Sequence, residues 1–477
     1  MSSILLQNGT IIVFDDHDSP QPVRADVLVK GNTIFQVGQG LKPLDESTEV
    51  IDCTDKIVAP GLIDTHHHMW QTQLKGRFAD STLFDYCYRG RKENEIQGVP
   101  ALSEILACKV GASGTSSLRR TFFGESLPRA WKLWIAAPLP SRTPDHVTQA
   151  ISATLTSGLR SFYCHAVVPE IKSWSPQFVL GDSPAWANDL LKTLAQKSPF
   201  GPNGRVRMGF AFDQLHLSKD TVREIIGTAR QLNLFPITAH AAGGFLRHIQ
   251  QTHDYGLLGP DWIFSHGGWV TLDELDLLKQ SGATISVTPE SELQMGHPMA
   301  PIESSDYPGL RDFGPRYCWS TSHGERKDNE DVCVKIGEVY AMATIRAARS
   351  LRLNAGQLKE AALADIVIYD TLSPSMIAGA AENPVAAIML HSSVRDVNTV
   401  IVDGVVRKRD GKFLPAELDA DAKVRVQEKV LGWSDVAKQV LRSRLEIEGR
   451  MKDVGFKESV VAQGIKDTFH LSDDLFA

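Results

Sequence analysis

The chain has 477 residues, 22% of them charged, and a formal net charge of -7. This length predicts one large domain plus a smaller one. The mild negative charge, without a basic block, argues against nucleic acid as a partner. The opening MSSILLQNGTIIVFDD contains neither a basic leader nor a long apolar run, so we expect a cytoplasmic protein without a membrane anchor. The six cysteines form no CxxC pair, which favours reduced thiols.

Strand signals cluster near the two ends of the chain. Between Ile4 and Ile57, short alternating runs are divided by Asn-Gly and Gly-Asn turn signals, which predicts a small antiparallel sheet. A second group of strand-like runs follows much later: ADIVIYD from Ala364, VAAIMLH from Val385 and VNTVIVDGVVRKRDGKFL from Val397. Neither group has many strands, so we predict one small β-sandwich domain composed of residues 1–60 and 355–414.

The middle of the chain, residues 61–354, alternates strand-like runs with helical patterns. This alternation favours parallel βα units and an α/β fold, a (β/α)8 TIM barrel. Seven strands are predicted: GLIDTHHH from Gly61, LRSFYCHA from Leu159, VRMGFAFDQ from Val206, FPITAHAA from Phe235, WIFSHGG from Trp262, ATISVTP from Ala283 and RYCWSTS from Arg316. The missing second strand should lie between about Ser113 and Pro140, where SSLRRTFF and KLWIAAP both remain candidates.

The end of the chain, residues 415–477, is expected to be a helical extension. The stretch from Asp419 to Arg450 has helical spacing and good helix formers. We expect this helix to pack on the outside of the molecule or at a subunit contact.

Three consecutive histidines follow the first predicted barrel strand, within VAPGLIDTHHHMWQTQLKG. Side chains alternate between the two faces of a strand, so His66 and His68 should point the same way and His67 the opposite way. Two imidazoles on one face at the mouth of a barrel can hold one divalent metal. The alternative is a loop of solvated histidines or an engineered tag, but a tag would not follow directly on PGLIDT. We therefore predict a metal site.

With Pro60, Gly61 and Asp64, this segment resembles the first barrel strand of the amidohydrolase superfamily. The resemblance is to its branch of metal-dependent deaminases and chlorohydrolases, which includes relatives of cytosine deaminase, guanine deaminase and triazine hydrolase. It implies the same plan as the strand pattern, with the barrel inserted between the two halves of the small domain.

In such barrels catalytic groups lie at the C-terminal ends of the strands. This rule singles out His240, at the end of FPITAHAA, and His266, at the end of WIFSHGG. The resemblance makes His66, His68 and His240 the metal ligands, with one zinc as the expected metal and iron as the alternative. It makes His266 a catalytic histidine that contacts the metal-bound water, or a ligand if a second metal binds.

Further residues are assigned to the substrate. Gln71 matches a family position that contacts substrate, and a surface glutamine is the alternative. After the seventh strand, TPESELQMGHP offers three side chains at the same rim, either as substrate contacts or as part of a solvated acidic loop: Glu290, Glu292 and His297.

The predicted eighth strand departs from the family pattern. The family usually ends this strand with an aspartate that binds metal and activates the water. Here the run reads CWSTSHGERKDNED, without a carboxylate at that position. His323, or a folded-back Asp328 or Asp331, would have to replace it.

The function implied is hydrolysis by metal-activated water. The substrate would be a small heterocyclic molecule with a cleavable carbon–nitrogen bond, through deamination or cyclic amide hydrolysis, or with a ring halide. The alternatives are a degenerate, catalytically impaired member of the superfamily and a metal-dependent decarboxylase on the same barrel. We expect a small-molecule substrate and a homodimer.

Overall fold

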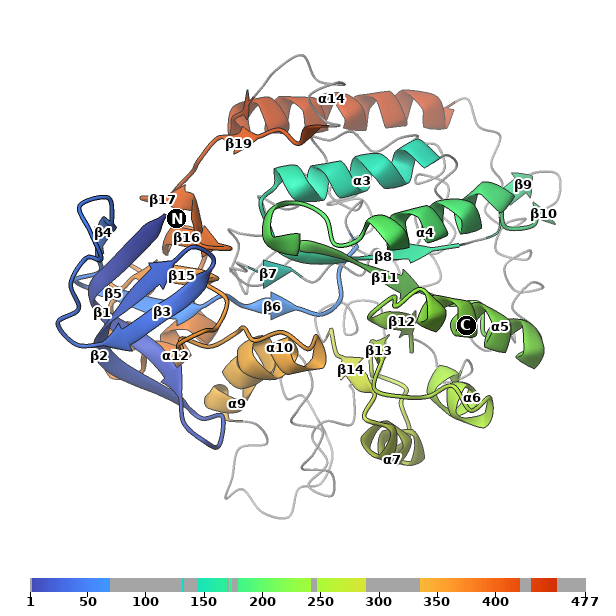
Figure 1. Cartoon of the computed structure of the whole chain (residues 1–477), viewed down its shortest axis with the longest axis horizontal. Helices are drawn as coiled ribbons and strands as arrows, with labels where there is room; N and C mark the ends of the chain where they lie inside the picture. Colours follow the sequence, from blue (N-terminus) through green and yellow to red (C-terminus); the bar gives the residue numbers. More distant parts are fainter. Residues whose placement is uncertain are drawn as a thin grey trace.

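The structure is a computed structural model that describes residues 2–68, 131–132, 144–167, 169, 171–173, 179–241, 247–288, 335–420 and 430–452. Figure 1 shows two main parts: a sheet that combines an early and a late segment of the chain, and a group of parallel strands with their helices. None of the described helices is long and apolar enough to cross a membrane.

Both chain ends contribute strands to one nine-stranded sheet. Its order is β18-β17-β16-β15-β5-β1-β2-β3, with β4 beside β1. The strands are β1 (Ser3–Phe14), β2 (Pro20–Lys30), β3 (Thr33–Gly38), β4 (Glu49–Asp52), β5 (Lys56–Pro60), β15 (Ile366–Asp370), β16 (Val397–Val402), β17 (Val405–Arg409) and β18 (Lys412–Phe413). The two ends join where β5 pairs antiparallel with β15. The predicted antiparallel sheet is mixed, since β1 runs parallel to both β4 and β5.

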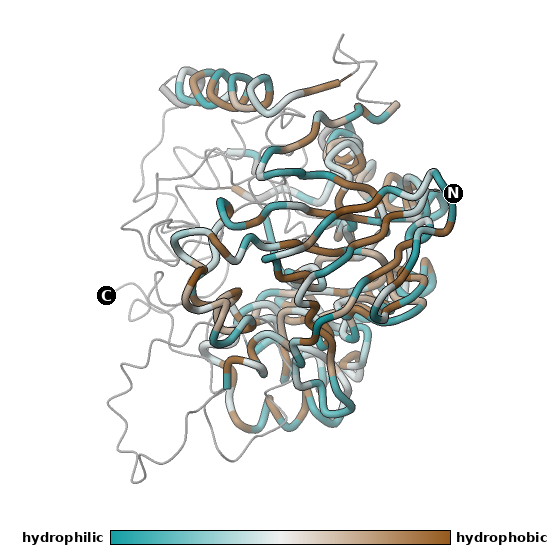
Figure 2. Tube along the Cα trace, turned by 90° about the vertical axis from the view of Figure 1, so that its left-hand side faces the viewer, coloured by the Kyte–Doolittle hydropathy of each residue, from teal (hydrophilic) through white to brown (hydrophobic). Residues whose placement is uncertain are grey.

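This sheet curls around an apolar interior. The backbone N–H of Ile34 in β3 donates to the carbonyl of Ala362 at 2.8 Å, and that of Ala364 donates to Asn32 at 2.8 Å, so the far edge meets the segment before β15. Figure 2 shows apolar stretches recurring along the strands. Apart from β4, the strands of this sheet follow one hydrogen-bonded path, and two separate sheets facing each other, as the predicted sandwich requires, are not seen among its described strands.

The dipeptide Asn8-Gly9 is a bulge inside β1, where the sequence predicts a turn. The register with β2 shifts between Leu6 and Gly9, and Asn8 has a φ of 66°. The Asn8 backbone N–H donates to Asp26 at 2.9 Å, which supports the bulge. A Cβ on Gly9 would lie 2.9 Å from Cγ2 of Val58, so glycine allows the close approach of β5.

The run VAAIMLH, predicted as a strand, is helical. It forms most of α12 (Pro384–Ala386) and all of the π-helix η6 (Ala387–His391). The side chain of Asn383 caps this helix by accepting from the Ala386 N–H, and Pro384 stands at the first helical position. The prediction was wrong because a short, buried apolar run has the same periodicity in a strand and in a helix.

The turn between β16 and β17 supplies a stability test. Asp403 and Gly404 have φ values of 57° and 71°, as in the hairpin turn typical of Asp-Gly. A Cβ on Gly404 would lie 1.7 Å from the carbonyl oxygen of Gly31. We expect Gly404→Ala to lower the free energy of unfolding by roughly 2–4 kcal/mol, because strain and a backbone clash combine.

Gly411→Ala is the matched control. Its φ is 73°, but a Cβ there meets no atom within 4 Å, so only the backbone strain of about 1–2 kcal/mol applies. Thermal unfolding midpoints of both variants measure the difference. Equal decreases of the thermal midpoint in the two variants would show that the clash between the new Cβ at position 404 and the Gly31 carbonyl costs no stability.

The middle of the chain forms a five-stranded parallel sheet, in the order β14-β13-β12-β11-β8. Its strands coincide with five predicted runs: β8 (Ser161–Ala166), β11 (Val206–Ala211), β12 (Ile237–His240), β13 (Trp262–Ser265) and β14 (Thr284–Ser286). The helices of this part are α3 (Pro144–Thr156), which precedes β8, and then α4 (Ala185–Lys197), α5 (Lys219–Gln231), α6 (His248–Asp254) and α7 (Leu272–Ser281). Parallel strands in chain order, alternating with helices, are the expected βα units.

Two further strands, β6 (Ile63–Asp64) and β7 (Trp131–Lys132), pair in parallel. The strand β7 overlaps the start of the candidate KLWIAAP, whereas the candidate SSLRRTFF and the run RYCWSTS lie outside the described residues. The described strands therefore do not close into a barrel. The small β-hairpin β9 (Ile171–Ser173) and β10 (Val179–Leu180) follows β8.

The parallel sheet is buried on both faces. Tyr163 of β8 belongs to a core formed with the helices, while its neighbours Phe162 and Cys164 belong to a core shared with the nine-stranded sheet. This second core also includes residues of α9 (Ile336–Ala341) and α10 (Ala347–Ser350), with the π-helix η5 (Met342–Arg346) between them. The two parts therefore share one apolar interior.

A buried charge cluster also joins the two parts. Arg160, just before β8, donates from Nε to Asp365 at 3.3 Å and from Nη2 to Asp403 at 2.7 Å. Asn203 donates to the other oxygen of Asp403 at 2.9 Å. The side chains of Arg160, Asp365 and Asp403 are all at most 5% exposed. The cluster fixes the start of β8 against the turns that flank β15 and β16.

The stretch predicted as helical from Asp419 to Arg450 contains one short strand. The strands β19 (Ala416–Glu417) and β20 (Val430–Leu431) pair, and α14 (Trp433–Lys452) follows. Ala420 is helical and residues 421–429 lie outside the described residues, so the predicted helix is interrupted at β20. Asp419 contacts α3, since its N–H donates to Thr156 at 3.0 Å and its carboxylate accepts from Ser152 at 3.0 Å.

Candidate metal centre

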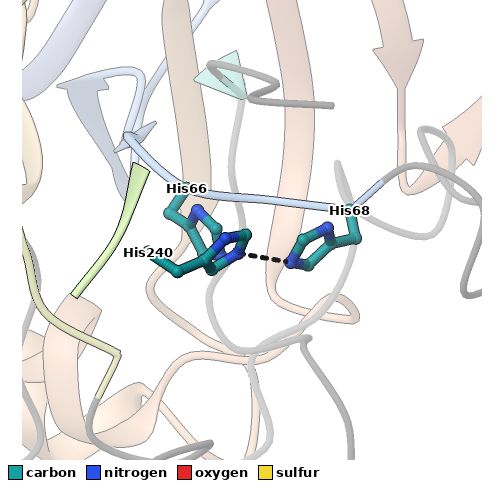
Figure 3. Close-up of side chains that lie close together, drawn as sticks. All are labelled: His66, His68 and His240. Atoms are coloured by element: carbon teal, nitrogen blue, oxygen red, sulfur yellow. Dashed lines mark hydrogen bonds between the residues drawn. The ribbon is translucent and has the colours of Figure 1, made fainter. Parts of the chain in front are cut away.

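Three histidines from two strand ends converge on one point (Figure 3). His66 and His68 lie just after β6, and His240 is the last residue of β12. One ring nitrogen from each lies within 4.8 Å of the other two. The ring centroids of His66 and His68 are 4.8 Å apart, and that of His240 lies 5.0 and 5.3 Å from them. The structure thus brings together the three histidines that the sequence singles out.

His67 lies outside this group. Its Nδ1 is 3.5 Å from Oδ2 of Asp64. The alternation predicted for a strand therefore describes the histidine segment, although β6 itself ends at Asp64.

The environment of His66 fits a metal ligand. The residue is buried, and neither ring nitrogen has a hydrogen-bond partner among the described residues. Burial, with the neighbouring histidines, holds the pKa of His66 and of His68 well below the ordinary value. Both rings are therefore neutral at pH 7 and can offer lone pairs. A buried polar atom without a partner costs about 1–3 kcal/mol, a cost that a bound cation would remove.

His240 is held by a carboxylate that the sequence analysis missed. Asp213, two residues after β11, accepts from the His240 backbone N–H at 2.8 Å and lies 2.8 Å from its Nδ1. Burial alone would raise the pKa of Asp213 and lower that of His240, but their mutual contact holds the Asp213 pKa low and the His240 pKa high. The position of Asp213 at the carboxyl end of a parallel strand was the available signal.

His266 lies beside the three histidines. Its ring centroid is 5.0 Å from that of His66 and 5.5 Å from that of His240. Its φ of 68° is unusual for a residue other than glycine, and its Nδ1 lies 2.5 Å from the hydroxyl of Thr288. Such backbone strain is concentrated at functional sites, where it aims a side chain.

The remaining predicted site residues lie outside the described residues. They are the predicted substrate contacts and the predicted replacements for the strand-eight aspartate: Gln71, Glu290, Glu292, His297, His323, Asp328 and Asp331.

Comparison with known proteins places this geometry in a family context. A model of the amidohydrolase family matches residues 316–407. The chain is 25% identical to 5-methylthioadenosine/S-adenosylhomocysteine deaminase of Thermococcus kodakarensis, over 85% of this chain and 93% of the relative. It is 26% identical to 5'-deoxyadenosine deaminase of Methanosphaera stadtmanae, over 90% of this chain and 99% of the relative.

Solved structures resemble most of the chain. A mutant of atrazine chlorohydrolase from Arthrobacter aurescens, complexed with zinc and atraton, superposes with a TM-score of 0.72 at 18% identity, covering 92% of this chain and all (100%) of that one. Guanine deaminase from C. acetobutylicum, with bound guanine, gives 0.67 at 15% identity over 85% of this chain and 100% of that one. These comparisons confirm the resemblance to amidohydrolases, and the structural likeness indicates a TIM-barrel-type fold with an additional domain.

Proposed function

We propose that this protein is a metal-dependent hydrolase that deaminates a small heterocyclic substrate. The observation that carries the proposal is the convergence of His66, His68 and His240, with both nitrogens of buried His66 free of hydrogen bonds to described residues. The deaminase relatives support a carbon–nitrogen bond as the point of cleavage. Removal of a ring halide is the second candidate, favoured by the likeness to a chlorohydrolase.

The three histidines would hold one divalent metal. Three imidazole ligands suit zinc, which also occurs in structures that this chain resembles. Iron remains the alternative. When bound, such a metal polarises a water molecule and lowers its pKa toward ~7, which makes hydroxide available for attack at neutral pH.

His266 is the proposed proton carrier. From its place beside His66, its imidazole would take a proton from the attacking water and deliver it to the leaving amine. The hydroxyl of Thr288 orients the ring through Nδ1. Gln71, Glu290, Glu292 and His297 remain predicted substrate contacts.

Other features of the proposal rest on the sequence. His323, Asp328 or Asp331 is the predicted replacement for the strand-eight aspartate. A homodimer and a cytoplasmic location also remain predictions. A degenerate protein would release no product, and a decarboxylase would release carbon dioxide in place of ammonia.

The test is metal analysis of the purified protein, followed by assays of ammonia, chloride and carbon dioxide release. The substrate panel contains purines and their nucleosides, pyrimidines, triazines and cyclic amides. We expect about one metal per chain and ammonia release from at least one heterocycle, lost after chelation and restored by Zn²⁺. A metal-free, inactive protein would indicate the degenerate alternative, and carbon dioxide in place of ammonia would indicate a decarboxylase.

A further inference from the structure

We propose that Asp213 is a positioning residue that fixes His240 in the one tautomer able to bind a metal through Nε2. The inference rests on the proposed metal site and assigns a role to a residue outside its ligand set. Its basis is the arrangement of Asp213, His240 and His248 at the ends of β11 and β12 and the start of α6.

The two oxygens of Asp213 both face His240. Oδ1 accepts from the backbone N–H at 2.8 Å, and Oδ2 lies 2.8 Å from Nδ1 of the ring. An ionised carboxylate has no proton to give, so Nδ1 must carry the hydrogen. The remaining lone pair of the imidazole is then on Nε2.

That nitrogen points into the histidine cluster. His240 Nε2 lies 3.4 Å from Nε2 of His68, and the two rings are nearly parallel, with 6° between their planes. With the opposite tautomer, Nε2 would carry a hydrogen where a ligand lone pair is needed. A carboxylate that bonds the outer nitrogen of a ligating histidine commonly sets both its orientation and its basicity.

The backbone of His240 is held from a second side. Buried His248, the first residue of α6, has its Nδ1 2.6 Å from the His240 carbonyl oxygen. The amide, the carbonyl and the outer ring nitrogen of His240 therefore all have fixed partners. Little freedom remains for the ring to turn away from the cluster.

Substitutions at Asp213 separate control of the tautomer from simple packing. In Asp213→Asn, the side-chain amide has one oxygen in place of two. If this oxygen accepts from the His240 backbone N–H, the NH₂ group faces Nδ1 as a donor. If it faces Nδ1, the backbone N–H has no acceptor. Asp213→Ala also lacks the carboxylate charge, but it has no polar group that would favour either tautomer of His240. Asp213→Glu keeps a carboxylate.

The experiment measures Zn²⁺ affinity of the full-length protein by competition with a chromogenic chelator, with the thermal midpoint of the metal-free form recorded alongside. We expect Asp213→Asn to bind Zn²⁺ about 10–100-fold more weakly than the wild type. Asp213→Ala should lose less Zn²⁺ affinity than Asp213→Asn, and Asp213→Glu should lose the least of the three. Asp261→Asn is the control, because Asp261 pairs with Arg230 away from the cluster and its loss should leave the affinity unchanged.

Unchanged affinity in Asp213→Asn would overturn the inference, as would a larger loss in Asp213→Ala than in Asp213→Asn. If Asp213→Asn does not fold, the comparison of Asp213→Glu with Asp213→Ala decides, and equal affinities overturn the proposal. A wild-type protein without Zn²⁺ affinity would instead overturn the metal site itself, so the two failures are distinguishable.

Discussion

Replacing His66 with alanine should produce a folded protein that retains no metal. The His66 ring makes no hydrogen bond to the described residues, so its removal breaks no such bond in the metal-free fold. Loss of one of three ligands should abolish stable metal binding. Turnover should fall by about 10³-fold or more, because several kcal/mol of transition-state stabilisation would be lost. Metal content after gel filtration and the rate of ammonia release are the measurements.

His67→Gln is the matched control for this experiment. His67 is the adjacent residue and is equally buried, at 6% exposure against 7% for His66, but it lies beside Asp64 and outside the cluster. The control should keep its metal. Metal retained by His66→Ala, or lost equally by both variants, would contradict the proposed ligand set.

Replacing Arg160 with methionine should cost about 3–5 kcal/mol of stability. The substitution keeps much of the side-chain volume but removes the guanidinium that pairs with buried Asp365 and with Oδ1 of Asp403, while Arg205 Nη1 remains 3.8 Å from Oδ2 of Asp403. A buried charge that loses its partner keeps its full desolvation penalty. The midpoint of thermal or chemical denaturation should fall accordingly.

Arg230→Met is the comparison for this variant. Arg230 pairs with Asp261 at 2.7 Å, but its side chain is 37% exposed, so its loss should cost only about 0–1 kcal/mol. Similar losses of stability in the two variants would show that the buried Arg160 cluster contributes no more than the exposed Arg230–Asp261 pair.

The sequence predicts the features that depend on periodicity. Five parallel strands and the convergence of His66, His68 and His240 follow from alternation and from the rule that strand ends share one edge. The strand predicted at Val385 was wrong, because short apolar runs do not distinguish a strand from a helix. Asp213 was missed because a single aspartate after a strand has no spacing pattern, and its role depends on a contact with the next strand along the chain.

The pairing of β5 with β15 also has a consequence for synthesis of the protein. These adjacent strands join residues near the two ends of the chain, with Val58 opposite Ile368. A ribosome adding about 5–20 residues per second needs roughly 15–60 s to make the ~300 residues between them. Throughout that interval the edge of β5 that will receive β15 has no partner from the same chain. The nascent chain must therefore keep this apolar edge from aggregating until its own C-terminal part emerges.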